Sequence, residues 1–147
     1  MKTRVLVVDD EREFADALSE RLVIRNYDVA ISLTGEDAVE KARKTNFDVV
    51  VLDVQLPGVD GIEVLRDIKR IKPLTEVIML TGHATVESAI LGMKLGAMDY
   101  LMKPCETDDL VAKIDRAQAK KAEQEERIRE AKVREIVSSP RAALREK

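Results

Sequence analysis

Five short apolar runs alternate along the chain with segments whose apolar residues recur every three or four positions. The runs cover residues 5–8, 27–31, 49–54, 77–80 and 98–102. Their lengths are those of β-strands, and the periodicity between them is that of amphipathic helices. Regular alternation of strands and helices predicts an α/β fold with a doubly wound parallel sheet, whose strands are joined by right-handed crossovers.

The periodic segments predict a helix after each strand and the face that each helix turns inward. The expected inward residues are Phe14, Leu18 and Leu22, then Ala38, Val39 and Ala42, then Ile62, Leu65 and Ile68, then Val86, Ala89, Ile90 and Met93, and finally Leu110, Val111 and Ile114. Thr34 and Asp60 are predicted N-caps of the second and third helices, and Gly96 is a predicted C-cap of the fourth.

The last helix is predicted to run past the domain, from about residue 107 to about residue 137. No glycine or proline interrupts this stretch, and Ala, Glu, Lys, Arg and Gln, all strong helix formers, dominate residues 116–135. We expect residues 1–117 to form one domain, and residues 118–147 to form a charged helical extension or linker with a frayed end. Its thin apolar stripe, without clean heptads, fits a dimer seam and a solvated helix equally well; the stripe contains Ile128, Ala131, Ile136 and Val137.

Polar residues stand at the carboxyl ends of four apolar runs. Asp9 and Asp10 follow the first run, Asp53 interrupts the third, Thr81 follows the fourth and Lys103 follows the fifth. These ends share one edge of a parallel sheet, where ligands of open α/β sheets bind. A lone strand-end aspartate is explained equally well as a loop cap. Three carboxylates drawn together repel one another, so one is protonated or a cation such as Mg²⁺ binds. With a lysine and a hydroxyl beside them, they provide what aspartyl-phosphate chemistry requires.

Composition restricts the compartment. The chain has 147 residues, of which 45% are hydrophobic and 3% aromatic, so the core must be aliphatic. The one cysteine, Cys105, excludes an internal disulfide and fits a reducing environment. The N-terminus is too short for a signal peptide, and no apolar run approaches the ~20 residues that span a bilayer. We therefore expect a cytoplasmic protein that makes no membrane contact.

Charge is distributed unevenly along the chain. Residues 1–115 carry 15 basic and 22 acidic side chains, whereas residues 116–147 carry 10 basic and 6 acidic ones. The charges of the tail alternate in sign, which favours a solvated helix face over a surface for an acidic partner. No helix-turn-helix or zinc-finger signature is evident, so we expect no direct binding of nucleic acid.

The polar motifs, in their order and spacing, resemble the receiver domain of two-component response regulators over residues 3 to about 117. The matching residues are Asp9-Asp10, Asp53 with Leu56-Pro57 and Asp60-Gly61, Thr81-Gly82, Tyr100, and Lys103-Pro104. The resemblance implies a flavodoxin-like, five-stranded parallel sheet of order 2-1-3-4-5. The segment Thr81-Gly82-His83-Ala84 is similar to receivers of nitrogen-regulation-type transcription activators. Cys105 departs from the Phe that often follows the Lys-Pro pair.

The resemblance also implies a phosphoacceptor and a metal site. Asp53 is the expected phosphoacceptor. Asp10, Asp53 and the backbone carbonyl of Gln55 are the expected Mg²⁺ ligands, and Asp9 is expected to act through water. The expected phosphoryl source is a sensor histidine kinase or a phosphotransfer protein, and the expected output is contact with a downstream protein target. Beyond Mg²⁺-dependent self-phosphorylation and self-dephosphorylation, no enzymatic activity is expected.

Two further roles follow from the resemblance. Thr81 and Lys103 are expected to hold the phosphoryl group, and Tyr100 is expected to turn inward on activation.

A cis peptide is predicted between Lys103 and Pro104. The final helix is expected to contribute to a homodimer, as in many receivers of the activator branch. His83 is predicted to be an exposed loop residue rather than a phosphocarrier.

Other functions remain as alternatives. The chain is either a freestanding receiver or the receiver and linker of a longer transcription activator. A phosphatase of the haloacid-dehalogenase type would need a second aspartate two residues after Asp53, where this chain has Gln55. A flavodoxin-like mononucleotide binder would need a phosphate loop rich in Gly, Ser or Thr after the first strand, where this chain has Asp9-Asp10-Glu11.

Overall fold

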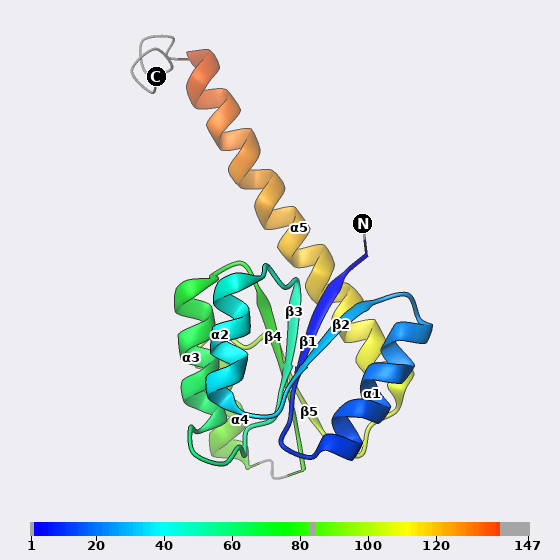
Figure 1. Ribbon diagram of the computed structural model, residues 1–147. Helices are drawn as coiled ribbons and strands as arrows, with labels where there is room; N and C mark the ends of the chain where they lie inside the picture. Colours follow the sequence, from blue (N-terminus) through cyan, green and yellow to red (C-terminus); the bar gives the residue numbers. More distant parts are fainter. Residues whose placement is uncertain (1, 83–84, 139–147) are drawn as a thin grey trace.

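The computed structural model describes residues 2–82 and 85–138 (Figure 1). Five parallel strands form a sheet in the order β2-β1-β3-β4-β5. The strands are β1 (Arg4–Val8), β2 (Asp28–Ser32), β3 (Val49–Leu52), β4 (Glu76–Thr81) and β5 (Asp99–Met102). The predicted strands, their parallel arrangement and the order 2-1-3-4-5 are confirmed, with ends that shift by one or two residues.

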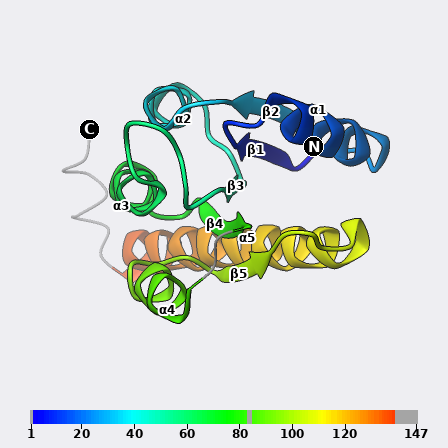
Figure 2. The same ribbon diagram turned by 90° about the horizontal axis from the view of Figure 1, so that it is seen from below.

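A helix follows each strand, and the helices cover both faces of the sheet. They are α1 (Arg12–Ile24), α2 (Gly35–Lys44), α3 (Gly61–Ile71), α4 (Val86–Lys94) and α5 (Thr107–Ser138). Helices α1 and α5 lie on one face, and α2, α3 and α4 lie on the other, as Figure 2 shows from below. This is the doubly wound arrangement that the alternating pattern predicts.

Each face of the sheet has its own aliphatic core. On the side of α2 and α3, Leu6, Val50 and Ile68 are fully buried. On the side of α1 and α5, Val5, Leu22 and Ile114 are fully buried. Strand β3 is buried along its whole length, as its continuous apolar sequence predicts for a central parallel strand.

Local signals in the sequence set several helix ends. The Thr34 hydroxyl accepts a hydrogen bond from the Asp37 amide at 3.1 Å, and the Asp60 carboxylate accepts one from the Ile62 amide at 3.0 Å. Gly96 follows α4 with a φ of +107°, a left-handed conformation in which glycine carries no steric cost. The predicted N-caps at Thr34 and Asp60 are therefore confirmed, whereas the C-cap of α4 is Leu95 and Gly96 is the residue that follows it.

The predicted inward face of α4 is wrong. Val86 is 76% exposed, Ile90 50% and Met93 47%. Among the described residues of α4, Gly92 is the buried one, and Ala89 is half-buried. The helix approaches the sheet through its small residues, so the bulkier apolar side chains face outward. Apolar spacing locates a stripe on a helix but does not show what covers it.

The final helix is continuous and leaves the domain, as predicted, from the edge of the sheet where the strands begin (Figure 1). Near that edge, Lys120 Nζ lies 3.4 Å from Glu76 Oε2, and Lys121 Nζ lies 3.2 Å from Asp48 Oδ1. From residue 126 to residue 138 every side chain is exposed. The predicted frayed end at residues 139–147 lies outside the described residues.

Within the described residues, no helix combines the length and the apolar character needed to cross a bilayer. The 32 residues of α5 would be long enough, but the helix is rich in charge.

Candidate functional site

Three carboxylates meet at the edge of the sheet where the strands end. Asp9 and Asp10 follow β1, Asp53 follows β3, and one oxygen from each lies within 4.8 Å of the others. Asp9 is 2% and Asp53 5% exposed, whereas Asp10 is exposed. Burial raises the pKa of Asp9, and the hydrogen bonds from Lys103 and from the Glu11 amide only partly offset this rise. Burial therefore disfavours the ionised form of Asp9 more than its hydrogen bonds favour it, and a further positive charge at the site would stabilise the carboxylates.

Backbone hydrogen bonds fix the two buried carboxylates. The Asp53 amide donates to the Val8 carbonyl at 3.0 Å, so the pairing of β1 and β3 continues into the loop that carries Asp53. One carboxylate oxygen of Asp53 then accepts a hydrogen bond from the Gln55 amide at 3.0 Å. Likewise, Asp9 accepts one from the Glu11 amide at 2.9 Å. Each aspartate caps its own loop and still presents its second oxygen to the site.

Lys103 reaches into the carboxylate cluster from the loop after β5. Its Nζ lies 2.5 Å from Asp9 Oδ2 and 3.4 Å from Asp53 Oδ2, and Glu11 Oε1 is 3.5 Å away. Burial lowers the pKa of Lys103, but the Asp9 hydrogen bond and the surrounding negative charges outweigh it, so the net pKa is raised. The predicted cis peptide between Lys103 and Pro104 is confirmed.

Phe14 is a member of the site that the sequence analysis missed. The Lys103 ammonium lies 4.0 Å from the centre of the Phe14 ring, within the range of a cation–π contact. The apolar spacing assigned Phe14 only to the inner face of the first helix. The position of Phe14 in the sequence could have indicated this contact. Phe14 lies in the first turn of α1, which begins directly after Asp9 and Asp10 at the same edge of the sheet.

The two predicted switch residues lie on neighbouring strands. Thr81 ends β4 and is fully buried, and its carbonyl accepts a hydrogen bond from the Lys103 amide at 2.9 Å. Tyr100 is half-buried on β5, and its hydroxyl lies 3.0 Å from the Ser88 hydroxyl of α4. The structure thus brings Thr81 next to the backbone of Lys103. It also connects Tyr100 with α4 through Ser88.

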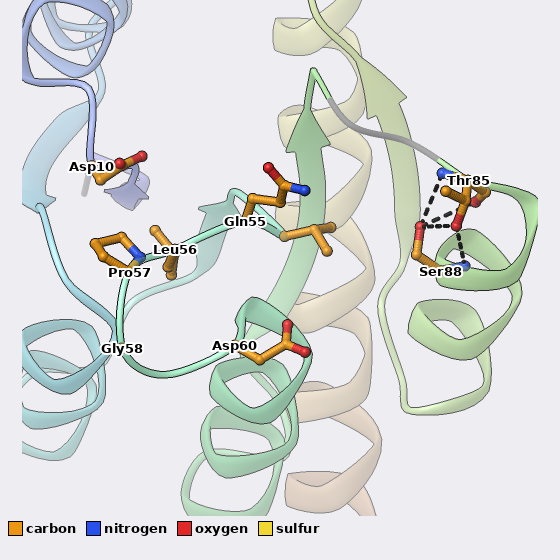
Figure 3. A pocket seen from close by; sticks show the side chains of 9 residues that line it. Asp10, Gln55, Leu56, Pro57, Gly58, Asp60, Thr85 and Ser88 are labelled. Atoms are coloured by element: carbon orange, nitrogen blue, oxygen red, sulfur yellow. Dashed lines mark hydrogen bonds between the residues drawn. The ribbon is translucent and has the colours of Figure 1, made fainter.

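A cleft of about 590 Å³ opens beside the carboxylates. Asp10 comes from the loop after β1, Gln55 and Asp60 come from the loop after β3, and Thr85 and Ser88 lie across from them at the start of α4 (Figure 3). The sequence analysis missed Thr85 and Ser88, because Ser88 stands where a capping box usually has Glu or Gln. The predicted loop position of His83 lies outside the described residues.

Gly61 holds the loop after β3 close to the phosphoacceptor candidate. Its amide donates to the Val54 carbonyl at 2.9 Å. A Cβ at this position would lie 2.4 Å from the Asp53 carbonyl oxygen and 2.6 Å from the Val54 Cα. Only glycine therefore allows the first turn of α3 to approach the backbone of Asp53 and Val54 this closely.

A parallel sheet of this order, with acidic residues after β1 and β3 and a lysine after β5, defines the class of the protein. The family model for the response regulator receiver domain matches residues 5–115. The chain belongs to this family: it is a receiver domain of two-component response regulators.

The chain is similar to named regulators and to solved receivers. It is 38% identical over 115 residues to the transcriptional regulatory protein ZraR of Escherichia coli, which covers 78% of this chain and 26% of ZraR. The chain thus spans about a quarter of that relative. A CheY-like receiver from Methanospirillum hungatei superposes with a TM-score of 0.82 at 29% identity, covering 84% of this chain and 99% of that one.

A second solved structure is a response regulator from Burkholderia pseudomallei with a phosphorylated aspartic acid, a calcium ion and citrate. It superposes with a TM-score of 0.73 at 27% identity and covers 84% of this chain and 75% of that one.

Proposed function

We propose that this receiver takes a phosphoryl group on Asp53 from a sensor histidine kinase or a phosphotransfer protein and then alters its contacts with protein partners. The observation that carries the proposal is the position of Asp53, which is buried beside two further carboxylates and 3.4 Å from the Lys103 ammonium. The phosphorylated aspartic acid of the Burkholderia relative supports the same chemistry.

In the proposed reaction, a carboxylate oxygen of Asp53 forms a bond to phosphorus while the bond between phosphorus and the donor's leaving atom breaks. Lys103 offsets the charge of the transferred group, and Thr81 offers a hydroxyl donor. Lys103 already contacts both Asp9 and Asp53, so it needs little movement to reach a phosphoryl oxygen. In self-dephosphorylation, a water oxygen forms a bond to phosphorus while the bond from phosphorus to the Asp53 oxygen breaks, which releases inorganic phosphate and restores the carboxylate.

The donor set fits Mg²⁺. Asp9, Asp10 and Asp53 supply oxygen ligands, which Mg²⁺ prefers, and their combined charge exceeds that of the neighbouring ammonium. We propose Asp10, Asp53 and the Gln55 carbonyl as ligands, with Asp9 acting through water. When bound, the ion would offset the charge of the carboxylates and of the approaching phosphoryl group.

The same proposal assigns the output. Phosphorylation would draw Thr81 toward the new group, and Tyr100 would turn inward. Tyr100 contacts α4 through the Ser88 hydroxyl, and α4 carries exposed apolar side chains. A movement of Tyr100 that alters α4 would change the surface available to a protein partner, which supports protein contact as the output. We place the protein in the cytoplasm. Residues 1–117 form the receiver, and residues 118–147 form an extension that is free or leads into the rest of a longer activator.

Intact-mass measurement after incubation with acetyl phosphate tests the phosphoacceptor. We expect one added phosphoryl group in the presence of Mg²⁺, none in EDTA, and none for Asp53→Asn under either condition. Asp60→Asn is the matched control, because Asp60 lines the same cleft but caps α3. Labelling of Asp53→Asn to the extent of the unsubstituted protein would exclude Asp53 as the acceptor.

The projecting part of α5 supports a homodimer with a second copy of this chain. Every side chain from residue 126 to residue 138 is exposed, and an isolated charged helix is marginal in water. Ile128 is 43% and Ile136 48% exposed, and they lie two helical turns apart on one side. A second α5 would bury both.

Sedimentation equilibrium of variants of the 147-residue chain tests the dimer. We expect Ile128→Asp and Ile136→Asp each to weaken self-association by roughly tenfold or more, because a buried isoleucine is worth about 1.5–3 kcal/mol. Val23→Asp is the control, since Val23 is 53% exposed on α1. A monomeric wild-type protein at high micromolar concentration would contradict the proposed dimer.

A further inference from the structure

A hydroxyl on α4 connects the helix to the proposed switch residue. Ser88 Oγ lies 3.0 Å from the Tyr100 hydroxyl, and Ser88 is also the partner of Thr85 in the capping box that begins α4. We infer that Ser88 is a positioning residue through which the orientation of Tyr100 controls the first turn of α4. This inference rests on the proposed function, which makes Tyr100 the switch.

The Ser88 hydroxyl is shared between the cap of α4 and Tyr100. Ser88 Oγ lies 3.1 Å from the Thr85 amide, 3.0 Å from the Thr85 carbonyl, and 3.0 Å from the Thr85 hydroxyl. A serine hydroxyl has one hydrogen and accepts two hydrogen bonds. Ser88 Oγ donates to the Thr85 carbonyl and accepts from the Thr85 amide and the Thr85 hydroxyl. The Tyr100 hydroxyl is a further partner of the same atom, so a movement of Tyr100 changes how the Ser88 hydroxyl is shared within the cap.

The first turn of α4 depends strongly on this cap. The helix has nine residues, and its large apolar side chains are exposed, so packing against the domain stabilises it little. Short helices are marginal without tertiary contacts. An N-terminal cap changes the equilibrium of such a helix by roughly five-fold. Loss of the Tyr100 hydrogen bond leaves the cap without one of its partners.

The Thr85–Ser88 cap of α4 lies at the cleft beside the proposed phosphorylation site. Thr85 and Ser88 line the same cleft as Asp10 and Gln55, opposite the loop that carries Asp53 (Figure 3). When Tyr100 turns inward, its hydroxyl leaves Ser88, and the first turn of α4 opens more often. The exposed side chains of Val86 and Ile90 then move with the start of the helix.

Amide hydrogen exchange of residues 86–90 tests the inference in a double-mutant cycle of Ser88→Ala and Tyr100→Phe. In the unphosphorylated protein we expect Tyr100→Phe to speed exchange about five-fold. In the Ser88→Ala background it should add nothing, and Ser88→Thr should restore the Tyr100 effect. Glu87→Gln is the matched control, because Glu87 lies in the same turn of α4. Its effect on the exchange rate should be independent of Tyr100→Phe, so the double variant should show the product of the two single effects.

Beryllofluoride with Mg²⁺ supplies the second measurement. We expect it to speed exchange in the wild-type protein and to have no such effect on Ser88→Ala. Independent effects of Ser88→Ala and Tyr100→Phe in the unphosphorylated cycle would overturn the inference. That cycle needs no phosphoryl group, so its failure is distinct from a failure of Asp53 to become labelled. A merely structural role of Ser88 would leave the response to beryllofluoride intact.

Discussion

Replacing Gly61 with alanine is expected to lower the free energy of unfolding by about 3 kcal/mol and to slow phosphorylation severely. The added Cβ would meet the Asp53 carbonyl oxygen at 2.4 Å and the Val54 carbonyl oxygen at 2.5 Å. Both are backbone atoms and cannot rotate away as a flexible side chain can. The first turn of α3 or the loop after β3 must therefore shift, and Asp53 moves with the loop. Urea unfolding and acetyl phosphate labelling measure the two effects.

Gly82→Ala provides the matched control for Gly61→Ala. A Cβ on Gly82 would have no neighbour within 4 Å among the described residues, although Gly82 directly follows Thr81. We expect its free energy of unfolding to stay within about 0.5 kcal/mol of wild type. Equal stability of Gly61→Ala and Gly82→Ala would show that the close approach at Gly61 does not constrain the loop.

Replacing Lys103 with methionine is expected to destabilise the Mg²⁺-free protein by about 3 kcal/mol, because the buried carboxylates of Asp9 and Asp53 lose their shared counter-charge. Added Mg²⁺ should restore more stability in this variant than in wild type. Labelling by acetyl phosphate should slow by roughly 10–100-fold, since a charge-assisted hydrogen bond worth about 1.5–3 kcal/mol is lost. Thermal unfolding with and without Mg²⁺ and timed mass measurements give both values.

Lys113→Met is the control for Lys103→Met. Lys113 pairs with Asp99 at 2.6 Å on the flank of β5, and its side chain is 25% exposed. Its removal costs a partly solvated ion pair, about 1 kcal/mol or less, and leaves the carboxylate cluster unchanged. Unchanged labelling of Lys103→Met would mean that this ammonium does not assist phosphoryl transfer.

Much of the fold was predictable because its strands are continuous apolar runs that can be recognised in the sequence alone. The run at β3 is apolar on both faces, which indicates a central strand of a parallel sheet. Polar residues such as Asp53 and Lys103 stand where apolar runs end, and parallel topology then places those ends together. The meeting of Asp9, Asp10 and Asp53 follows from these two facts alone; their roles in catalysis and metal binding stay predictions.

The features that escaped prediction depend on packing between elements distant in sequence. The outward orientation of Val86 and Ile90 depends on which side of α4 packs inward, the side of the buried Gly92, and apolar periodicity does not encode this. The contact of Phe14 with Lys103 joins the first turn of α1 to the loop after β5. The bond between Ser88 and Tyr100 needs the register of β5 against α4. Each is a property of the assembled fold rather than of a local segment.

Helix α5 begins shortly after Lys103 and leaves the domain beside Asp48 and Glu76, at the opposite edge of the sheet (Figure 1). In the proposed dimer, a phosphoryl donor that reaches Asp53 and a second helix that lies along residues 126–138 would therefore occupy opposite ends of the molecule. Neither would block the other, so each member of the pair could be phosphorylated while the dimer stays intact. Such a dimer would have three states, with no, one or two phosphoryl groups, and its response to a phosphoryl donor would be graded by their number.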